Sequence, residues 1–521
     1  MASLTLARQY AERLAVPRRR DLLIVLAAAA AQVLYVALAR SNTGAFGYPL
    51  DDSWIYQTYA RNLAQTGQWA FIPGVPSTGS TSILWTLVLA PGYLLPVSAY
   101  LWTQLAGFGA LVAAALGAAR LLPEDRPVVS LAAGLAVALE WHLVWAASSG
   151  METPLFAALV IWFWVWLRRH DPAARGHRWQ DGLLTGVWGG MLMLTRPEGV
   201  LAFGVAGLYG LLASGSLIAS GSLRARLRWS VAAGVGFALL LGPFMAFNHA
   251  VSGSVWPNTF YAKQTEYSVL YARPYLLRFL DQATVMFVGL PLVLIPGIVA
   301  EIWHRVRLRT DLVGLAPLAW VVLHWAAYAA RLPVVYQHGR YAIPVVAVLV
   351  AYGVHGLARL VRPRHHRLLV RAGSQAWLLV AALLAVLMTA TIGGPAYAEN
   401  VQWIERDIVA AARWIGENTA PDEVIAAHDI GALGYFAPRP LLDLAGLVSP
   451  EIIPYMSDVA LLADYVEESD AGYLVCFPAW SRTYEALVAT LPVEPVWSAD
   501  EQAGYGEPSH LGAMTIYRIQ R

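Results

Sequence analysis

Residues 47–86 read GYPLDDSWIYQTYARNLAQTGQWAFIPGVPSTGSTSILWT, and the interpretation of the whole chain depends on this stretch. It follows the first long apolar segment and carries two adjacent carboxylates, Asp51 and Asp52. An amphipathic stretch comes next, and then a turn region rich in Gly, Pro, Ser and Thr. Ionisable groups beside a membrane core are costly, so the pair indicates either a functional site or an exit loop with solvated acids.

The composition predicts a membrane protein. Hydrophobic residues make up 58% of the 521 positions and charged residues only 13%, whereas soluble proteins are about one quarter charged. A water-soluble core cannot hide so much apolar surface, so we expect an all-α polytopic membrane protein. The single cysteine, Cys476, excludes an intrachain disulfide framework. The net charge of +2, without a basic patch among aromatic residues, gives no indication of a nucleic-acid partner.

Lys263 is the only lysine among the 36 Lys and Arg residues. The chain uses Arg nearly everywhere else, as a GC-rich coding sequence would. An ammonium group is a compact point charge and a guanidinium group is a fork, so the two are not interchangeable at a binding site. Lys263 therefore either fills a position that requires a point charge or is a lysine retained by chance.

Twelve apolar segments follow one another between residues 22 and 392. Several are shorter than the roughly 20 residues that a straight span needs, which indicates tilted, broken or re-entrant helices beside a polar cavity. The segments cover 22–39, 83–95, 101–119, 128–146, 154–167, 182–194, 200–212, 229–247, 283–302, 312–330, 341–360 and 376–392.

Basic clusters orient these segments through the positive-inside rule. Arginines at 18–20 precede the first segment, so the N-terminus is expected in the cytoplasm and the Asp51 loop outside. Twelve spans would return the C-terminal tail to the cytoplasm, whereas the later clusters place it outside. We therefore expect 11 or 13 spans, with a non-spanning segment or a broken pair between residues 83 and 146. The later clusters lie at 168–178, 224–228, 305–309 and 362–371.

The composition changes after residue 392, where the chain becomes more charged and shows short alternating patterns. We expect a transmembrane domain over 1–395, whose first outer loop covers 40–82, and a small extracytoplasmic α/β domain over 396–521. In the second domain, Asp429 and Asp443 are expected to form turns. The expected helix and strands of that domain cover 401–418, 424–427, 472–477 and 514–519.

The polar outliers of the membrane domain collect on its outer side, beside the two carboxylates. They lie in four short motifs: SGMET at 149–153, TRPEG at 195–199, WPNTFYAK at 256–263 and YQHGRY at 336–341. Loop charges without a function would be distributed over both faces, so this convergence predicts a shared cavity. The residues expected to contact a substrate are Tyr56, Glu152, Arg196, Glu198, Asn258, Tyr261 and Tyr341.

A carboxylate pair, a cationic set and a cavity within the lipid suit transfer of a group from a lipid phosphate. No Walker loop or Gly-rich nucleotide cradle is present, so we expect no nucleotide cofactor. One carboxylate would act as general base on an acceptor hydroxyl, and Lys263, Arg340 and His338 would stabilise the departing phosphate. Because neighbouring acids repel, one pKa is expected to rise. A divalent cation (Mg²⁺ or Mn²⁺) is an alternative, with Asp52 or Glu152 as its ligand.

Each of these elements also has a purely structural interpretation. Arg196 and Glu198 could form an ion pair at a helix broken by proline. Glu152 precedes a helix start, where a carboxylate favours the positive end of the dipole. His338 and Arg340 border a span and could meet lipid headgroups.

Taken in order, the motifs resemble the GT-C superfamily of integral-membrane glycosyltransferases, and most closely the bacterial branch with the mycobacterial terminal arabinofuranosyltransferase. The likeness covers residues 22–360 and rests on DD, YARNLAQTG, STGSTSILWT, SGMET, TRPEG, WPNTFYAK and HGRY. It implies the GT-C fold and an inverting transfer of a sugar from a polyprenyl-phosphate donor. The acceptor would be a hydroxyl of a glycan, lipid or protein outside the cytoplasmic membrane.

In such enzymes an Asp of the first outer loop acts as the base, which implies Asp51 or Asp52 here, with Asp51 favoured. For the donor, the nearest likeness suggests decaprenyl-phosphate arabinofuranose. This chain has Ser-Thr-Gly-Ser at 77–80 where relatives commonly carry Glu-Gly-Tyr, so the likeness fixes neither the sugar nor the use of a metal.

Two other classes of protein compete with this interpretation. A transporter or flippase for a lipid-linked glycan would also place charges near a cavity. Transporters often show internal repeats and sites near the midplane, whereas these motifs gather at one face and no repeat is visible. An adhesin or scaffold anchored by many spans would leave the polar motifs without a role.

Overall fold

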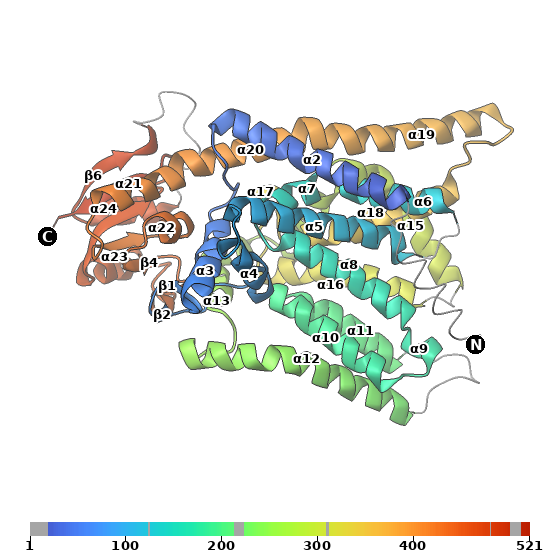
Figure 1. The fold of residues 1–521 in the computed structure, drawn as a ribbon, viewed down its shortest axis with the longest axis horizontal. Helices are drawn as coiled ribbons and strands as arrows, with labels where there is room; N and C mark the ends of the chain where they lie inside the picture. The colour runs from blue at the N-terminus through green and yellow to red at the C-terminus, as the bar shows by residue number, and fades with distance from the viewer. Residues whose placement is uncertain are drawn as a thin grey trace.

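Figure 1 shows the fold in a computed structural model, which describes residues 19–122, 126–212, 223–308, 312–479, 481–500 and 512–520. A bundle of helices forms most of the molecule, and a small sheet domain lies at one of its ends. Arg18 and Arg309, two members of the expected basic clusters, lie outside the described residues.

Within these ranges, six helices are long and apolar enough to cross a membrane, or up to eight if each of two bent pairs counts as one crossing. Each of the six contains or largely overlaps an expected apolar segment. Many of their Leu and Val side chains point outward and are exposed, for example on the first and third of these helices, which suits a lipid environment. The six are Arg19–Thr43 (α2), Ala99–Leu121 (α5), Leu223–Ser252 (α12), Val313–Arg331 (containing α16, Ala316–Arg331), Ile343–Leu360 (containing α18, Val346–Leu360) and Leu368–Asn418.

The segments between residues 83 and 148 explain why twelve straight spans do not fit. Helix α4 (Ile83–Leu89) and the following turn η1 (Ala90–Tyr93) are together too short to cross a bilayer. Helices α6 (Pro127–Ala138) and α7 (Trp141–Ser148) form a pair bent by 53°. A short apolar element and a bent helix pair, which match the two alternatives expected for this region, both occur here. Helix length and composition do not decide between 11 and 13 spans.

A second break divides the segment expected at 283–302. Here Tyr275–Phe287, which contains α14 (Tyr275–Thr284) and η3 (Val285–Phe287), meets α15 (Leu290–Leu308) at 107°. The remaining helical elements of the bundle are α8 (Thr153–Arg169), α9 (Pro172–Arg175), α10 (Trp179–Thr195), α11 (Gly199–Leu212), α13 (Asn258–Glu266), η2 (Tyr267–Ala272), η4 (Leu312–Leu315), α17 (Tyr336–Gly339) and η5 (Ile343–Val345).

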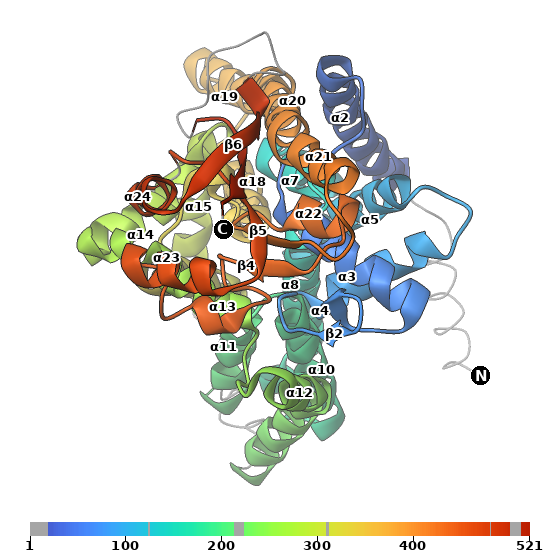
Figure 2. The same ribbon diagram turned by 90° about the vertical axis from the view of Figure 1, so that its left-hand side faces the viewer.

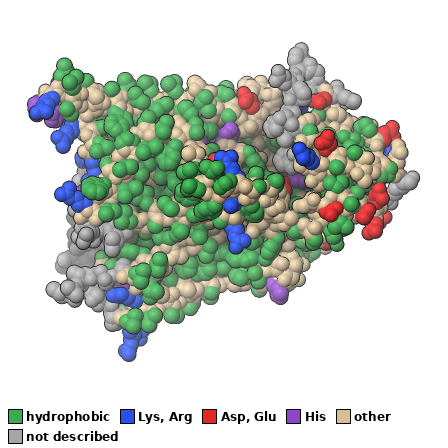
Figure 3. All heavy atoms as spheres, turned by 180° about the vertical axis from the view of Figure 1, so that it is seen from behind, with side chains coloured by type: hydrophobic (Ala, Val, Ile, Leu, Met, Phe, Trp, Pro, Cys, Tyr) green, Lys and Arg blue, Asp and Glu red, His purple; other side chains and the backbone are tan. Residues whose placement is uncertain are grey.

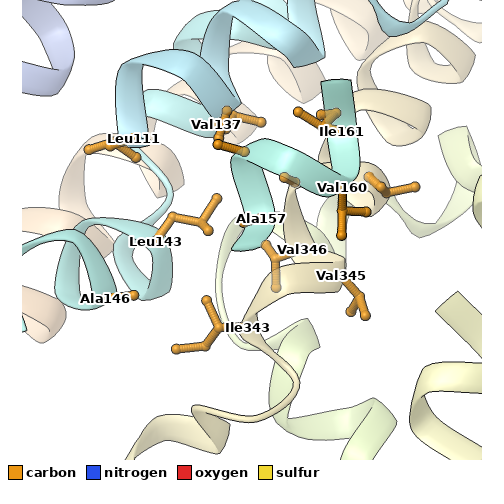
Figure 4. Close-up of a cluster of buried hydrophobic side chains, with 14 of the residues drawn as sticks. Leu111, Val137, Leu143, Ala146, Ala157, Val160, Ile161, Ile343, Val345 and Val346 are labelled. Carbon is orange, nitrogen blue, oxygen red and sulfur yellow. The ribbon is translucent and has the colours of Figure 1, made fainter. Parts of the chain in front are cut away.

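The core of the bundle is apolar and forms where α5, α6, α7, α8 and α18 meet (Figure 4). Small residues allow the backbones to approach closely, as in other membrane bundles. At the crossing of α15 and α18, a Cβ on Gly356 would lie 1.7 Å from the carbonyl oxygen of Gly297, so only glycine fits there.

Charge is distributed unevenly along the molecule. Figure 3 shows many of the visible Lys and Arg side chains at the end of the bundle away from the sheet domain, others midway along the molecule, and Asp and Glu side chains mainly on the sheet domain. The described arginines of the expected basic clusters include Arg168 and Arg169 at the end of α8 and Arg305 and Arg307 at the end of α15.

The first loop folds against the sheet domain. It contains the amphipathic helix α3 (Asp52–Thr66) and a hairpin of β1 (Ala70–Ile72) and β2 (Val75–Pro76). Helix α3 ends at Gly67, whose φ of 72° is in the left-handed region that favours glycine at this position.

One continuous helix of 51 residues, Leu368–Asn418, connects the bundle to the sheet domain. The helix expected at 401–418 is its last part, and the expected domain boundary at 395/396 falls inside it. It includes two π-helical turns, which are commonly found at functional sites. Its parts are α19 (Leu368–Leu387), η6 (Met388–Gly393), α20 (Gly394–Trp403), η7 (Ile404–Val409) and α21 (Ala410–Asn418).

The C-terminal domain has a five-stranded mixed sheet in the order β4-β3-β5-β7-β6, in which β3 is parallel to β4 and β5. Figure 2 looks onto this domain. Helices α21 and α22 pack on one face of the sheet, and α23 and α24 on the other. The three expected strands are present, whereas β4 and β6 were not expected. The elements are β3 (Val424–Ala427), α22 (Gly431–Phe436), β4 (Leu441–Asp443), η8 (Pro450–Ile452), α23 (Val459–Glu468), β5 (Ala471–Cys476), α24 (Arg482–Thr490), β6 (Val493–Ser498) and β7 (Thr515–Ile519).

Candidate active site

A cavity of about 370 Å³ lies where the bundle meets the first loop and the C-terminal domain. Its walls are mostly apolar, and its charged residues, apart from Arg331, come from the carboxylate pair and the expected outer motifs. This agrees with the expectation that those motifs share a cavity. The polar lining includes Asp52, Tyr56, Thr81, Glu152, Arg196, Glu198, Lys263, Gln264, Tyr328, Arg331, Arg340 and Tyr341.

Asp52 is paired with two cations at this cavity. Its carboxylate lies 2.6 Å from Nη2 of Arg340 and 3.1 Å from Nζ of Lys263. Both cations also donate to the hydroxyl of Tyr341, at 2.9 Å from Arg340 and 3.3 Å from Lys263. Burial by itself would raise the pKa of Asp52, but the two positive charges outweigh burial and hold this pKa below its usual range. The carboxylate is therefore ionised at neutral pH.

Helix α13 places Lys263 at the cavity by docking on the Ser/Thr-rich turn of the first loop. Thr259 donates its hydroxyl to the carbonyl oxygen of Gly79 at 2.7 Å. The backbone N–H of Asn258 donates to Thr78 at 3.4 Å. Asn258 is therefore part of the docking contact and does not line the cavity, and the half-exposed Tyr261 does not line it either.

Arg340 leaves an unusual left-handed turn. Gln337, His338 and Gly339 have φ values of 53°, 59° and 65°, and the first two are not glycine. Non-glycine residues in this region are uncommon and cost free energy. The turn sends the ring of His338 against Trp141 and Trp145, where its Nε2 is 3.0 Å from the side-chain oxygen of Asn400.

His338 consequently does not line the cavity, so the structure gives no support to its expected place in the phosphate-binding set. The two residues on either side of Gly339 point to different sites because of the left-handed turn. Only Lys263 and Arg340 of the expected cationic set face Asp52.

Asp51 faces the C-terminal domain and does not line the cavity. Its two carboxylate oxygens accept from the backbone N–H groups of Gly431 and Ala432, at 2.7 and 2.8 Å. Burial raises the pKa of Asp51 to about 8, and the nearby charge of Asp429 adds to the shift. One pKa of the pair is raised as expected, but Asp52 is only a minor cause. The structure gives the position at the cavity to Asp52, against the preference for Asp51.

Arg196 is the centre of a second charged cluster in the cavity wall. Its guanidinium lies 2.5 Å from a carboxylate oxygen of Glu152 and 2.5 Å from one of Glu198. It also donates to the hydroxyl of Tyr328 at 2.8 Å, and that hydroxyl donates to Glu198. The ion-pair interpretation of Arg196 and Glu198 is confirmed, and both residues also face the cavity.

Glu152 and Tyr56 both line the cavity. Glu152 occupies the N-cap position of α8, as the capping interpretation expects, but its side chain makes no capping hydrogen bond and is paired with Arg196. The hydroxyl of Tyr56 shares a hydrogen bond of 2.9 Å with Thr81.

Several lining residues were not anticipated from the sequence, among them Tyr328, Gln264 and Leu447. Tyr328 lies in an apolar segment, one helical turn after His324. Two polar rings at positions i and i+4 share one face of a helix, and this pattern could have indicated that Tyr328 faces a polar site. Leu447 belongs to the C-terminal domain, in a loop whose backbone N–H groups donate to the carboxylate of Asp443.

The donor set does not fit a divalent cation. Among the described residues, no group of three or more His, Cys, Asp or Glu side chains could hold a metal. Asp52 already carries two cationic partners, and Glu152 is bound to Arg196. A dication would have to compete with these fixed positive charges, so neither carboxylate is a suitable metal ligand in this arrangement.

The chain shares its fold with solved structures of GT-C enzymes. The archaeal oligosaccharyltransferase AglB from Archaeoglobus fulgidus, in complex with an inhibitory peptide and a dolichol-phosphate, has a TM-score of 0.58 at 11% identity, over 90% of this chain and 71% of that one. ArnT from Cupriavidus metallidurans bound to undecaprenyl phosphate has a TM-score of 0.55 at 16% identity, over 95% of this chain and 97% of that one.

The chain therefore shares the fold of these two proteins, with several helices long and apolar enough to cross a membrane and a small C-terminal sheet domain. Residues 392–513 also match a family described as a domain of unknown function (DUF8728). No curated protein matches the sequence. The likeness to the arabinofuranosyltransferase branch stays a prediction.

Proposed function

We propose that the chain is a glycosyltransferase that moves a sugar from a polyprenyl-phosphate donor to a hydroxyl of an extracytoplasmic glycan, lipid or protein. The observation that carries the proposal is the position of Asp52 between Lys263 and Arg340 at a cavity lined largely by apolar surface. A base next to two cations suits the departure of a phosphate, and apolar walls suit a lipid donor.

In the proposed reaction the acceptor oxygen attacks the anomeric carbon of the donor sugar. Asp52 takes the proton of the acceptor hydroxyl as the new C–O bond forms. The bond between the anomeric carbon and the phosphate oxygen breaks, and its electron pair goes to the phosphate. Lys263 and Arg340 stabilise the charge that develops there. Attack from the side opposite to the phosphate inverts the anomeric centre.

Binding of the donor would also strengthen the base. Without donor, both cations are engaged by Asp52 and keep its pKa low. A bound phosphate shares these cations and brings its own negative charge close to the carboxylate. Both changes raise the pKa of Asp52 toward the range in which a carboxylate accepts protons effectively. Lys263 and Arg340 then serve first as partners of the base and later as partners of the phosphate.

The second charged cluster is proposed to recognise the sugar. Arg196, Glu152 and Tyr56 all line the cavity. Buried polar groups of this kind discriminate strongly between sugars, because a missing hydroxyl leaves them unpaired. Decaprenyl-phosphate arabinofuranose is the particular donor we propose.

The membrane orientation follows from the basic clusters. We propose that the end with Arg168, Arg169, Arg305 and Arg307 is cytoplasmic, so the cavity and the C-terminal domain lie outside. If α4 does not cross, each bent pair crosses once, and the shorter helices α8, α10 and α11 also cross, the total is 11 spans, which is the alternative we propose.

The proposal is tested by offering purified protein a panel of polyprenyl-phosphate pentoses and hexoses with a mixed set of acceptor glycans. We expect release of polyprenyl phosphate with at least one donor, together with a glycosylated acceptor of inverted configuration. No release with any donor, combined with movement of a lipid-linked glycan across proteoliposome membranes, would establish the transporter or flippase alternative instead.

A further inference from the structure

We propose that the unit over residues 392–513 acts as a clamp that positions three of the charged residues of the cavity, each through a neighbour in the sequence. The three are Asp52, Lys263 and Arg340. The catalytic role of the clamp rests on the proposed function, but the contacts that form the clamp do not depend on any substrate. It assigns a task to a segment whose family is described only as a domain of unknown function.

The first contact holds Asp52 through Asp51. The carboxylate of Asp51 accepts two backbone N–H groups of the clamp, from Gly431 and Ala432. The approach is close, since a Cβ on Gly431 would lie 2.1 Å from the carbonyl oxygen of Asp51. Asp51 immediately precedes α3, whose first residue is Asp52. A fixed position of Asp51 therefore fixes the direction in which the side chain of Asp52 points from the first turn of α3.

The second contact holds Lys263 through Glu266. Both lie on α13, three residues apart and therefore on neighbouring turns of one face. Glu266 forms an ion pair of 3.4 Å with Nε2 of His428, whose Nδ1 is 3.3 Å from Asp429. His428 directly follows β3. The C-terminal end of this parallel strand therefore carries the contact to Glu266 as well as the contact to Asp51.

The third contact holds Arg340 through His338. The side-chain oxygen of Asn400, on the long helix, accepts from Nε1 of Trp145 at 3.2 Å. Because an indole nitrogen only donates, this atom of Asn400 must be the oxygen, and Nε2 of His338 must donate to it at 3.0 Å. The bond fastens a turn with two strained non-glycine residues, which holds its shape only when its surroundings fix it.

The three contacts share a pattern. In each, a residue of the clamp binds a side chain that lies one, two or three positions from a cavity charge in the sequence. The clamp also closes the cavity with Leu447. His428, Asn400 and Asp51 are positioning residues on this account, because they act through the neighbours of the charges.

Hydrogen exchange of the full-length protein tests the clamp without any substrate. In His428→Ala we expect the amides of 258–266 to exchange about tenfold faster, as the loss of one hydrogen bond to a charged group would produce, with 336–341 unchanged. In Asn400→Ala we expect the reverse pattern. His428→Gln should restore slow exchange, since its amide nitrogen reaches the place of Nε2. Gly373→Ala on the same long helix meets nothing within 4 Å and should change neither segment.

Unchanged exchange in both segments of both variants would overturn the clamp, and so would a uniform increase that includes α5. Activity gives a second readout. His428→Ala should raise KM for the donor about tenfold, with kcat changed less than about threefold, whereas an equal fall of kcat at constant KM would contradict positioning of Lys263. If the wild type turns over no donor, the proposed function fails, and the exchange pattern still decides the clamp.

Discussion

The carboxylate of Asp52 lies 2.6 Å from the guanidinium of Arg340, and this pair brings the first loop of the chain to the last outer motif of the bundle. Lys263, which lies in a third segment of the chain, forms a second ion pair with Asp52. The arrangement puts a carboxylate and two cations into contact at the cavity, and the predictions below follow from the roles proposed for them.

Lys263 should act mainly on the donor. Lys263→Ala removes a charge-assisted contact to the phosphate, so KM for the polyprenyl-phosphate sugar should rise about 10- to 100-fold. The KM for the acceptor should change much less, as measured by initial rates with each substrate varied in turn. Lys263→Arg keeps the charge and should recover part of the loss. A larger effect on the acceptor than on the donor would refute the phosphate role of Lys263.

Arg196 should be essential for stability. Its guanidinium neutralises Glu152 and Glu198 in the interior, and Arg196→Met would leave both carboxylates without their cation. Breaking a buried pair in this way costs about 3–5 kcal/mol of unfolding free energy. Denaturant unfolding in detergent measures the loss. The matched control is Arg413→Ala, whose side chain is 56% exposed and 4.0 Å from Glu405, and which should cost less than about 1 kcal/mol. Equal effects of the two variants would contradict the central place of Arg196.

Asp51 should make stability depend on pH. Its pKa is raised from 3.8 to about 8, first by burial and then by Asp429. Between these pH values the folded chain binds more protons than the unfolded chain, so stability falls as pH rises, by at most about 1.4 kcal/mol per pH unit. Asp51→Asn carries no titrating group and should flatten this part of the unfolding profile. The exposed Asp464→Asn should leave the profile as in the wild type. An unaltered slope in Asp51→Asn would show that Asp51 titrates normally.

The membrane orientation predicts which ends of the molecule can be labelled. The single native thiol is buried and can be removed as Cys476→Ala. In that background, the exposed Asp464→Cys should react with a membrane-impermeant maleimide in intact cells. The exposed Arg364→Cys should react only after the membrane is opened. The opposite labelling pattern would show the reverse membrane orientation, with the cavity on the cytoplasmic side.

The sequence predicted which motifs meet, because topology alone places them on one side. Positive charges orient the spans. Polar residues that follow apolar segments on the same side of the membrane are therefore expected to gather in a common cavity. Lys263 next to the carboxylates could be anticipated for this reason. The strands over 424–427, 472–477 and 514–519 were also recognisable from their apolar runs, whereas the three-residue β4 and the proline-containing β6 gave no usable pattern.

The sequence could not predict which carboxylate faces the cavity. Asp51 and Asp52 are adjacent at a helix start, and successive residues point about 100° apart around a helix. Which of the two carboxylates faces the cavity depends on where the C-terminal domain docks, and no local sequence pattern predicts that docking. The direction of His338 was hidden for a similar reason, because a left-handed turn of non-glycine residues is set by its surroundings and not by its own residues.

The most direct measurement compares Asp52→Asn with Asp51→Asn in the release of polyprenyl phosphate from the best donor. Asp52→Asn should lower kcat by about 10²- to 10⁴-fold, since it removes the general base. Asp51→Asn keeps one oxygen for the backbone of Gly431 or Ala432 and should lower kcat less than about tenfold. The reverse order of the two variants, or release that survives Asp52→Asn, would contradict the assignment of Asp52 as the base.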